Sequence, residues 1–382
     1  MLLMLLLTGC TTRSASAPET SPTPEPTEDT VITAGDAAIT ADVPVPTPEG
    51  DDLPPADVTP EPSEEPQAEP EEPGVFYNPL TGEVSDRDYG AARPVAVMVE
   101  NNYWTPSDMI TQSGISQAAI VYEMEVEKTT RNMAIFTDID QVGEIMPIRS
   151  ARSYFASAAL AYDAIYVRRG ASSAGRELAS TFLQYYTDND DIDLDNGYVN
   201  SYRYDDSEHS LATSGQLLTD WFASVGTRME HKSDNYDYGL HFTENAAPTH
   251  GDAANSIRIV FPEMKITSFT YSAEKNGYAG FQWNGDWIDK NSGETVVFQN
   301  VLVLCTDIEV GIDRQWHSAM TTVNYEGKGF FCNGGYCEPI TWSRGNYTTP
   351  FRYYDAESNE LELGVGHTYI AFISDEGYVS FP

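Results

Sequence analysis

The chain has 382 residues and a formal net charge of −38, from 21 Lys and Arg residues against 59 Asp and Glu residues. This length is enough for two domains of ordinary size. The acidity argues against a nucleic-acid partner, because no basic stripe is available to neutralise phosphates.

The N-terminus predicts a lipid anchor. Residues 1–10, MLLMLLLTGC, are a short apolar run that ends in Leu-Thr-Gly-Cys. This ending resembles a bacterial lipobox, after which the signal peptide is removed and the cysteine is lipid-modified. The usual positively charged start is absent, so we expect residues 1–10 to be a truncated signal peptide. Lipid on Cys10 would hold the protein on the extracytoplasmic face of the cell membrane.

Residues 11–74 have the composition of a tether. They contain 16 acidic residues against one basic residue, 14 of the 23 prolines and no aromatic residue. Such a segment cannot bury enough apolar surface to offset the entropy of ordering, so we expect it to be disordered.

Residues 75–250 predict an N-terminal domain of mixed α and β structure. Strands are expected at 93–101, 119–127, 131–138 and 164–170. Helical spacing of apolar residues predicts helices, with Ser150 capping the first and Gly226 ending the last. The predicted helices are 150–162, 172–186 and 213–226.

Residues 251–382 predict a second, mostly antiparallel β-rich domain. Short aromatic and β-branched runs are separated by Gly, Asn and Asp clusters, as in a barrel or sandwich. The boundary is expected in the loop-like stretch 245–254. The predicted fold class is therefore α+β.

Cysteine usage fits export without establishing it. Cys332 and Cys337 flank Asn-Gly-Gly-Tyr, a strong hairpin signal, so the two cysteines are either disulfide-bonded or free thiols. No second Cys or His pair lies at metal-ligand spacing, so we do not expect a zinc site. We also expect no other metal and no cofactor.

Long words of the sequence resemble a known family, the YerB-like lipoproteins of Gram-positive bacteria. The matching words are NPLTGE (78–83), RPVAVMVEN (93–101), SGISQAAIVYEMEVE (113–127), VGEIMPIRSARSYF (142–155), YDAIYVRRGAS (162–172), NVLVL (300–304), GKGFF (327–331) and LGVGHTYI (363–370). The resemblance implies a cell-surface lipoprotein with paired N- and C-terminal domains of unknown function, and supplies no activity. His209 carries over from the family pattern, whereas the family's histidine-glycine stretch is replaced here by residues 167–170, VRRG.

The strongest polar pattern is a row of glutamates in IVYEMEVE, which includes Glu123 and Glu127. Alternating residues of a strand share one face, so the row should line a single face. Arg149 and Arg152 bracket the start of a predicted helix, where free N–H groups and the helix dipole favour an anion. We expect the glutamates to meet these arginines, either as a structural ion-pair network or around a ligand. The full predicted ligand-binding set is Glu123, Glu127, Arg131, Arg149, Arg152, Arg168 and Arg203.

A catalytic alternative uses the same glutamates as the acid and base of a cell-wall glycan-cleaving enzyme. Carboxylates two residues apart in the row, such as those of Glu123 and Glu125, would lie about 7 Å apart, within the ~6.5–9.5 Å of an inverting glycosidase. A single strand aims both in one direction, however, so the fit is partial. His209, which follows Asp205 and Asp206, is a further catalytic candidate, with a solvated loop histidine as the alternative.

Together these patterns predict a membrane-anchored binding lipoprotein rather than an enzyme. Its ligand would be an anionic cell-envelope component or a protein partner. A third interpretation is a structural module whose β-rich half docks another envelope protein. A deep pocket at Glu123 would favour binding or catalysis there, whereas a closed ion-pair cluster would favour the docking module.

Overall fold

The structure is a computed structural model, and it describes residues 31–33, 75–101, 112–126, 129–171, 190–194, 199–207, 209–233, 235–262, 265–283, 285–306, 308–310, 318–320, 326–346, 348–374 and 377–382. Cys10, most of the predicted tether, Glu127 and the predicted helix at 172–186 lie outside these residues. One part of the predicted tether is described: Val31–Thr33 form strand β1, where disorder was expected.

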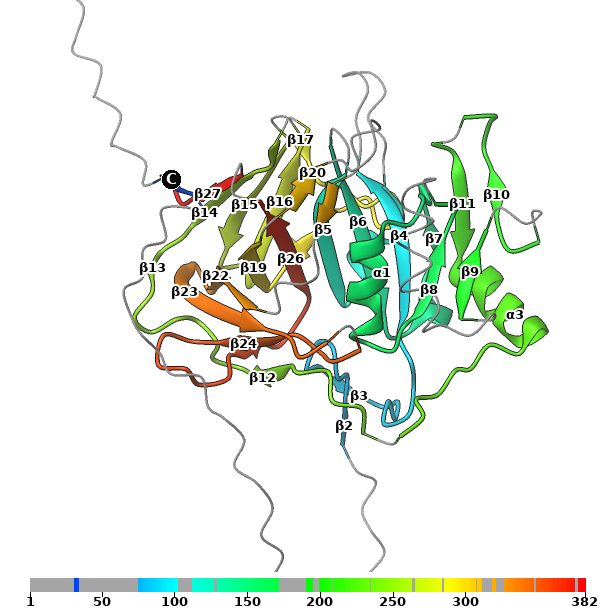
Figure 1. The fold of residues 1–382 in the computed structure, drawn as a ribbon, viewed down its shortest axis with the longest axis horizontal. Helices are drawn as coiled ribbons and strands as arrows, with labels where there is room; N and C mark the ends of the chain where they lie inside the picture. The colour runs from blue at the N-terminus through cyan, green and yellow to red at the C-terminus, as the bar shows by residue number, and fades with distance from the viewer. Residues whose placement is uncertain are drawn as a thin grey trace, which may run out of the picture.

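A mixed sheet built from both halves of the chain forms the centre of the molecule (Figure 1). Its central strands β4 (Val95–Asn101) and β5 (Ile120–Val126) are buried at every position, as expected for strands in the interior of a sheet. In order across the sheet the strands are β13 (Asp252–Ala253), β23 (Tyr336–Ser343), β22 (Glu326–Asn333), β19 (Asn300–Cys305), β26 (Thr368–Ile373), β5 (Ile120–Val126), β6 (Thr129–Phe136), β4 (Val95–Asn101), β8 (Ile165–Arg168) and β9 (Asp191–Asp193), with β24 (Arg352–Tyr354) beside β23.

The two halves of the chain meet where β5 pairs with β26. The strands run parallel, from Ile120 opposite Thr368 to Met124 opposite Phe372. The hydrogen bonds of a single sheet therefore cross between the predicted N- and C-terminal domains. The boundary placed at 245–254 stays a prediction.

A second, antiparallel sheet packs against one face of the first. It contains β1 (Val31–Thr33), β27 (Tyr378–Ser380), β14 (Ser256–Val260), β15 (Ile266–Ser272), β16 (Gly277–Gln282) and β17 (Gly285–Asp286), in that order, with β18 (Val297–Phe298) also pairing with β16. Short pairings complete the described strands: β10 (Tyr202–Arg203) with β11 (Leu211–Ser214) and β11 with β7 (Glu144–Ile145), β12 (His241–Thr243) with β25 (Glu362–Gly364), β2 (Phe76–Tyr77) with β3 (Val84–Ser85), and β20 (Ile308–Val310) with β21 (Ser318–Met320).

Two α-helices are described, α1 (Ser153–Leu160) and α3 (Gly215–Val225), with short 3-10 helices at Ile115–Gln117 and Ile139–Gln141. Ser214 caps α3 by accepting a hydrogen bond from the Leu217 amide. Gly226 ends the helix in the left-handed region, at φ +70°, as its position predicted. The N-cap of α1 is Arg152 rather than the predicted Ser150.

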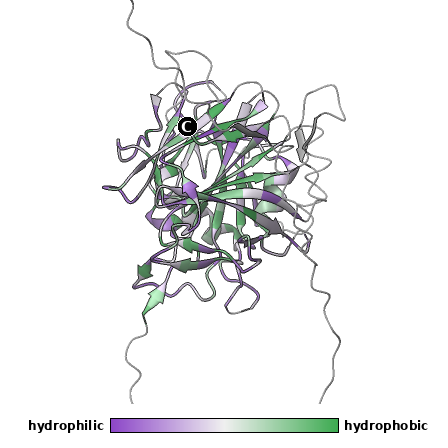
Figure 2. Ribbon diagram, turned by 90° about the vertical axis from the view of Figure 1, so that its left-hand side faces the viewer, coloured by the Kyte–Doolittle hydropathy of each residue, from purple (hydrophilic) through white to green (hydrophobic). Residues whose placement is uncertain are grey.

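The two faces of the central sheet contribute to different cores. One core contains Val121 of β5, Phe269 of the second sheet and Phe222 of α3. The other contains Tyr122 of β5 and Phe155 of α1. In the hydropathy colouring of Figure 2, hydrophobic residues are concentrated on the interior strands. Because successive residues of a strand alternate between faces, the parity of a charged residue determines which core it enters.

The predicted fold class holds in its coarser form. Strands predominate in both halves of the described chain, and the C-terminal half is β-rich as expected. The mixed α/β character of the N-terminal half is only partly supported, because the described helices there are short and few.

Candidate functional site

Glu123 lies at the centre of a buried polar cluster that joins the two halves. Its side chain is fully buried on the β5 face that packs against the second sheet. From the N-terminal half, Asn101 Nδ2 and Thr130 Oγ1 donate to Oε1 at 3.0 and 2.5 Å. From the C-terminal half, Tyr369 OH donates to Oε2 at 2.7 Å and Thr267 Oγ1 lies 2.9 Å from Oε2. This carboxylate is therefore satisfied by the protein itself.

Lys265 completes the cluster. Its Nζ lies 3.6 Å from Glu123 Oε1 and donates to Gln282 Oε1 at 2.9 Å. The side chain is only 1% exposed, and Nζ lies 4.3 Å from the centre of the Trp283 ring. Burial lowers the pKa of Lys265 to about 8, although the Glu123 carboxylate acts in the opposite direction. Since both charges are enclosed, the geometry is that of an internal ion pair between the halves.

Of the expected pairings between the glutamate row and the arginines of PIRSAR, that of Glu123 with Arg149 is not formed, whereas those of Glu127 lie outside the described residues. Arg149 Nε lies 3.3 Å from Glu100 Oε1, and His209 Nδ1 lies 2.7 Å from Glu100 Oε2. Asn101 on β4 contacts Glu123, and successive residues of a strand point to opposite faces. The neighbouring residue Glu100 therefore lies on the face of the sheet opposite to the Glu123 cluster. No sequence pattern indicates which face of the sheet the segment 147–152 covers.

Arg131 and Arg152 meet at Ser150, directly before α1. Arg131 NH1 donates to the Ser150 carbonyl at 2.7 Å, and Arg152 NH1 lies 3.1 Å from Ser150 Oγ. Both residues are 6% exposed. The structure thus brings together two of the predicted arginines at the start of the helix, in a largely buried position.

Burial raises the pKa of Tyr166, and the charges of Arg168, Arg131 and Arg152 act in the opposite direction, so these three predicted arginines lie around one hydroxyl, whereas Arg203 has separate surroundings. Arg168 is paired with Asp191 and Asp193 of β9, at 2.7 and 2.9 Å. These two ion pairs join β9 to the end of β8. Burial alone would lower the pKa of the Arg168 guanidinium, but Asp191 raises it above its usual value. Arg203 NH1 donates to the Ser207 carbonyl at 2.9 Å, within its own turn.

The cysteines that flank the predicted hairpin form a disulfide. Cys332 on β22 and Cys337 on β23 lie directly opposite each other, with 4.1 Å between their Cα atoms. In the described part of the chain, no group of three or more His, Cys, Asp or Glu side chains is arranged to hold a metal ion. None of the helices there has the length and hydropathy needed to cross a membrane.

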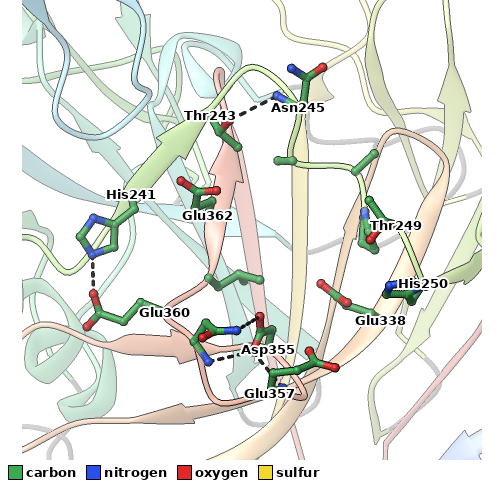
Figure 3. Close-up of a pocket in the computed structure, with 15 residues that line it drawn as sticks. His241, Thr243, Asn245, Thr249, His250, Glu338, Asp355, Glu357, Glu360 and Glu362 are labelled. Carbon is green, nitrogen blue, oxygen red and sulfur yellow. Dashed lines mark hydrogen bonds and ion pairs between the residues drawn. The ribbon is translucent and has the colours of Figure 1, made fainter.

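An open pocket lies in the C-terminal half, away from the predicted site (Figure 3). Its volume is about 580 Å³. Its walls come from β12, the following loop to His250, the start of β25 and the turn after β24. Its charged and histidine side chains are His241, His250, Glu338, Asp355, Glu357, Glu360 and Glu362.

Negative charge in this pocket is only partly compensated. His241 Nε2 lies 2.6 Å from Glu360 Oε2, and Arg352 NH1 lies 3.3 Å from Glu360 Oε1. Asp355 accepts hydrogen bonds from the amides of its own turn. Partial burial, followed by repulsion from Asp355 and Glu357, raises the pKa of Glu338. A cationic ligand would relieve this repulsion.

Sequence reasoning missed this pocket. A signal was present in YDAESNELELG, residues 354–364, where acidic residues are frequent. These residues meet 241–250, more than a hundred positions earlier in the chain, through the parallel pairing of β12 with β25. Local sequence pattern does not predict that pairing.

Comparisons with known proteins agree with the family predicted from the sequence. Residues 80–227 match the family model "Protein of unknown function (DUF3048) N-terminal domain", and residues 257–370 match the corresponding C-terminal domain. The chain is 27% identical over 232 residues to the lipoprotein YerB of Bacillus subtilis (strain 168), a match that covers 59% of this chain and 66% of that protein. This is slightly less than two thirds of the relative's length.

The crystal structure of the YerB protein from Bacillus subtilis is similar, with a TM-score of 0.65 and 25% identity, covering 80% of this chain and 99% of that one. The chain therefore belongs to the YerB-like lipoprotein family, which is defined by these paired N- and C-terminal domains.

Proposed function

We propose that this protein is an extracytoplasmic docking lipoprotein, anchored through lipid on Cys10, whose β-rich half binds a basic segment of an envelope protein. The observation that carries the proposal is the open acidic pocket between β12 and the turn after β24. The lipobox-like ending at Cys10 and the named lipoprotein relative support the anchor.

The charge distribution within the pocket favours a cationic ligand. Glu338, Glu357 and Glu362 line the pocket together with Glu360. Among the described residues, the ion pairs of these four glutamates are those of Glu360, with His241 and Arg352. Partial burial raises the pKa of Glu338, and repulsion from Asp355 and Glu357 adds to this effect. A Lys- or Arg-rich segment would pair with these carboxylates and lower that repulsion.

The openness of the pocket distinguishes it from the Glu123 cluster. Glu123 is fully buried and accepts hydrogen bonds from both halves, so a glycan could reach it only if the halves separated. A wall-cleaving acid must touch the glycosidic oxygen. Glycan cleavage through Glu123 is therefore the less supported interpretation, and incubation with purified peptidoglycan followed by fragment analysis would test it.

A second candidate function is anion binding where Arg131 and Arg152 meet at Ser150. Their shared contact with Ser150 at the start of α1 is the observation that favours it. Inorganic phosphate is a suitable probe, with Arg131→Lys as the variant that keeps the charge but loses the planar fork. Phosphate binding that weakens in this variant would support the site, whereas equal binding would remove it.

The pocket is tested by the binding of a fluorescein-labelled hexalysine peptide to the full chain, followed by fluorescence anisotropy. We expect the double variant Glu338→Gln/Glu362→Gln to bind about tenfold more weakly, equivalent to about 1.4 kcal/mol. The matched control is Glu274→Gln/Glu326→Gln, which removes the same charge at exposed sites outside the pocket. Equal weakening in the two double variants would mean that only net charge attracts the peptide, and the proposal would fail.

A further inference from the structure

The outer edge of β27 carries a strand from the N-terminal tether. Val31–Thr33 pair antiparallel with β27, with Val31 opposite Ser380 and Thr33 opposite Tyr378. The other edge of β27 is occupied by β14. Without β1, the outer N–H and C=O groups of β27 would form an open sheet edge, which is a ready acceptor for an extended segment.

The sequence of the tether independently marks this segment. Thr30–Thr33 are four consecutive β-branched residues, and no other such run occurs in residues 11–74. Residues 27–43 contain no proline, although the tether as a whole contains 14. β-branched residues favour strands, and proline cannot donate to a ladder of hydrogen bonds. The composition of residues 27–43 is therefore compatible with the strand that Val31–Thr33 form.

We propose that Val31–Thr33 are a strap that fastens the tether to β27 of the same chain and so sets how far the body can move from the membrane. The chain between Cys10 and Val31 can span at most about 75 Å, whereas the chain between Cys10 and Val75 could span about 230 Å. Fastening the strap thus shortens the maximum reach to about a third of its unfastened value.

The strap also determines which edge of the body faces the anchor. In Figure 1, β27 lies at the upper left of the body, and β12 lies below it, near the lower edge. A chain fastened at β27 would present the acidic pocket, which includes β12, away from the membrane. This consequence for the pocket rests on the proposed function, whereas the strap itself does not.

A cross-linking experiment on the full chain tests the strap without the lipid. In a Cys10→Ala background, Val31→Cys and Ser380→Cys place thiols at directly opposite positions. The control pair, Thr23→Cys with Ser380→Cys, starts eight residues earlier. For an unfastened chain the two pairs should differ by less than about 1.5-fold, because loop closure depends weakly on length. We expect the Val31 pair to form at least about ten times more intramolecular disulfide, because pairing raises its local concentration.

Two proline variants test whether strand pairing causes this preference. Ile32→Pro should abolish the excess cross-linking, since proline disrupts the pairing, whereas Ile39→Pro should leave it unchanged. Equal yields from the Val31 and Thr23 pairs would overturn the proposal. Cross-links between two chains in place of those within one would also overturn it, because β27 would then be an acceptor for a second copy.

The reach is measured separately with the lipidated chain on a supported bilayer, by neutron reflectometry. Ile32→Pro should let the body extend beyond the distance of about 75 Å from the bilayer that limits the fastened edge. An identical profile for wild type and Ile32→Pro would contradict the effect on reach. Failure of the wild type to stay on the bilayer would instead contradict the Cys10 anchor. The cross-linking test of the strap does not depend on that anchor, because it uses the Cys10→Ala chain.

Discussion

Glu123 and Glu338 are carboxylates on strands of the same sheet, yet their surroundings are opposite. Glu123 on β5 is enclosed by hydroxyl, amide and ammonium donors from both halves of the chain. Glu338 on β23 lines an open pocket and is repelled by Asp355 and Glu357. A satisfied, buried carboxylate stabilises the fold, whereas an open group of like charges costs stability and favours a cation.

The largest expected effect comes from breaking the enclosed cluster. Glu123→Gln preserves the side-chain size but leaves the buried Lys265 ammonium without its counter-charge. Removing one partner of a buried ion pair destabilises proteins by about 3–5 kcal/mol. Urea unfolding of the full chain measures the change, with Glu326→Gln on the exposed end of β22 as the control. A loss no larger than that of the control would contradict the structural role of Glu123.

The contribution of Lys265 to the pH dependence of the unfolding free energy tests the positively charged partner in the same cluster. Its folded pKa of about 8 lies below its usual value of 10.5. Between these two values the unfolded chain binds more protons than the folded chain, so this residue makes stability rise with pH. Lys265→Met should remove that rise, which is about 1–2 kcal/mol between pH 7.5 and 9.5.

The measurement compares unfolding free energies of wild type and Lys265→Met at both pH values. Subtracting one protein from the other cancels the titration of groups that they share. A stability difference that does not change with pH would indicate that the lysine keeps an ordinary pKa in the folded protein.

The smallest expected effect comes from the open pocket. The pKa of Glu338 is raised, so its ionised form opposes folding above that pKa, and the opposition disappears as the carboxyl is protonated at lower pH. Glu338→Gln should therefore raise the melting temperature slightly at pH 7.5, and the gain should fade towards pH 4. A lower melting temperature at pH 7.5 would mean that Glu338 has a stabilising partner, which would weaken the comparison with Glu123.

The sequence predicted local structure better than it predicted contacts. Alternation in IVYEMEVE correctly indicated a strand, and Gly226 correctly marked the end of a helix. The surroundings of Glu123 could not be predicted, because they depend on Thr267 and Tyr369, which lie 144 and 246 residues later. Lys265 is not part of any recognisable sequence motif. Its role as the counter-charge of Glu123 is evident only from its buried position beside that carboxylate.

The pocket was missed for a related reason. Its walls join 241–250 to 355–362 through the parallel pairing of β12 and β25. Each segment alone is typical of a polar surface loop. Only their association concentrates carboxylates around a cavity.

Amide hydrogen exchange of the full chain, with and without hexalysine peptide, reports on the acidic pocket and on the Glu123 cluster in one experiment. We expect slower exchange in 241–250 and 355–362 when the peptide is bound, with no change in Ile120–Val126 of β5. Protection of the segment around Ser150 and β5, with none at the pocket, would contradict the account.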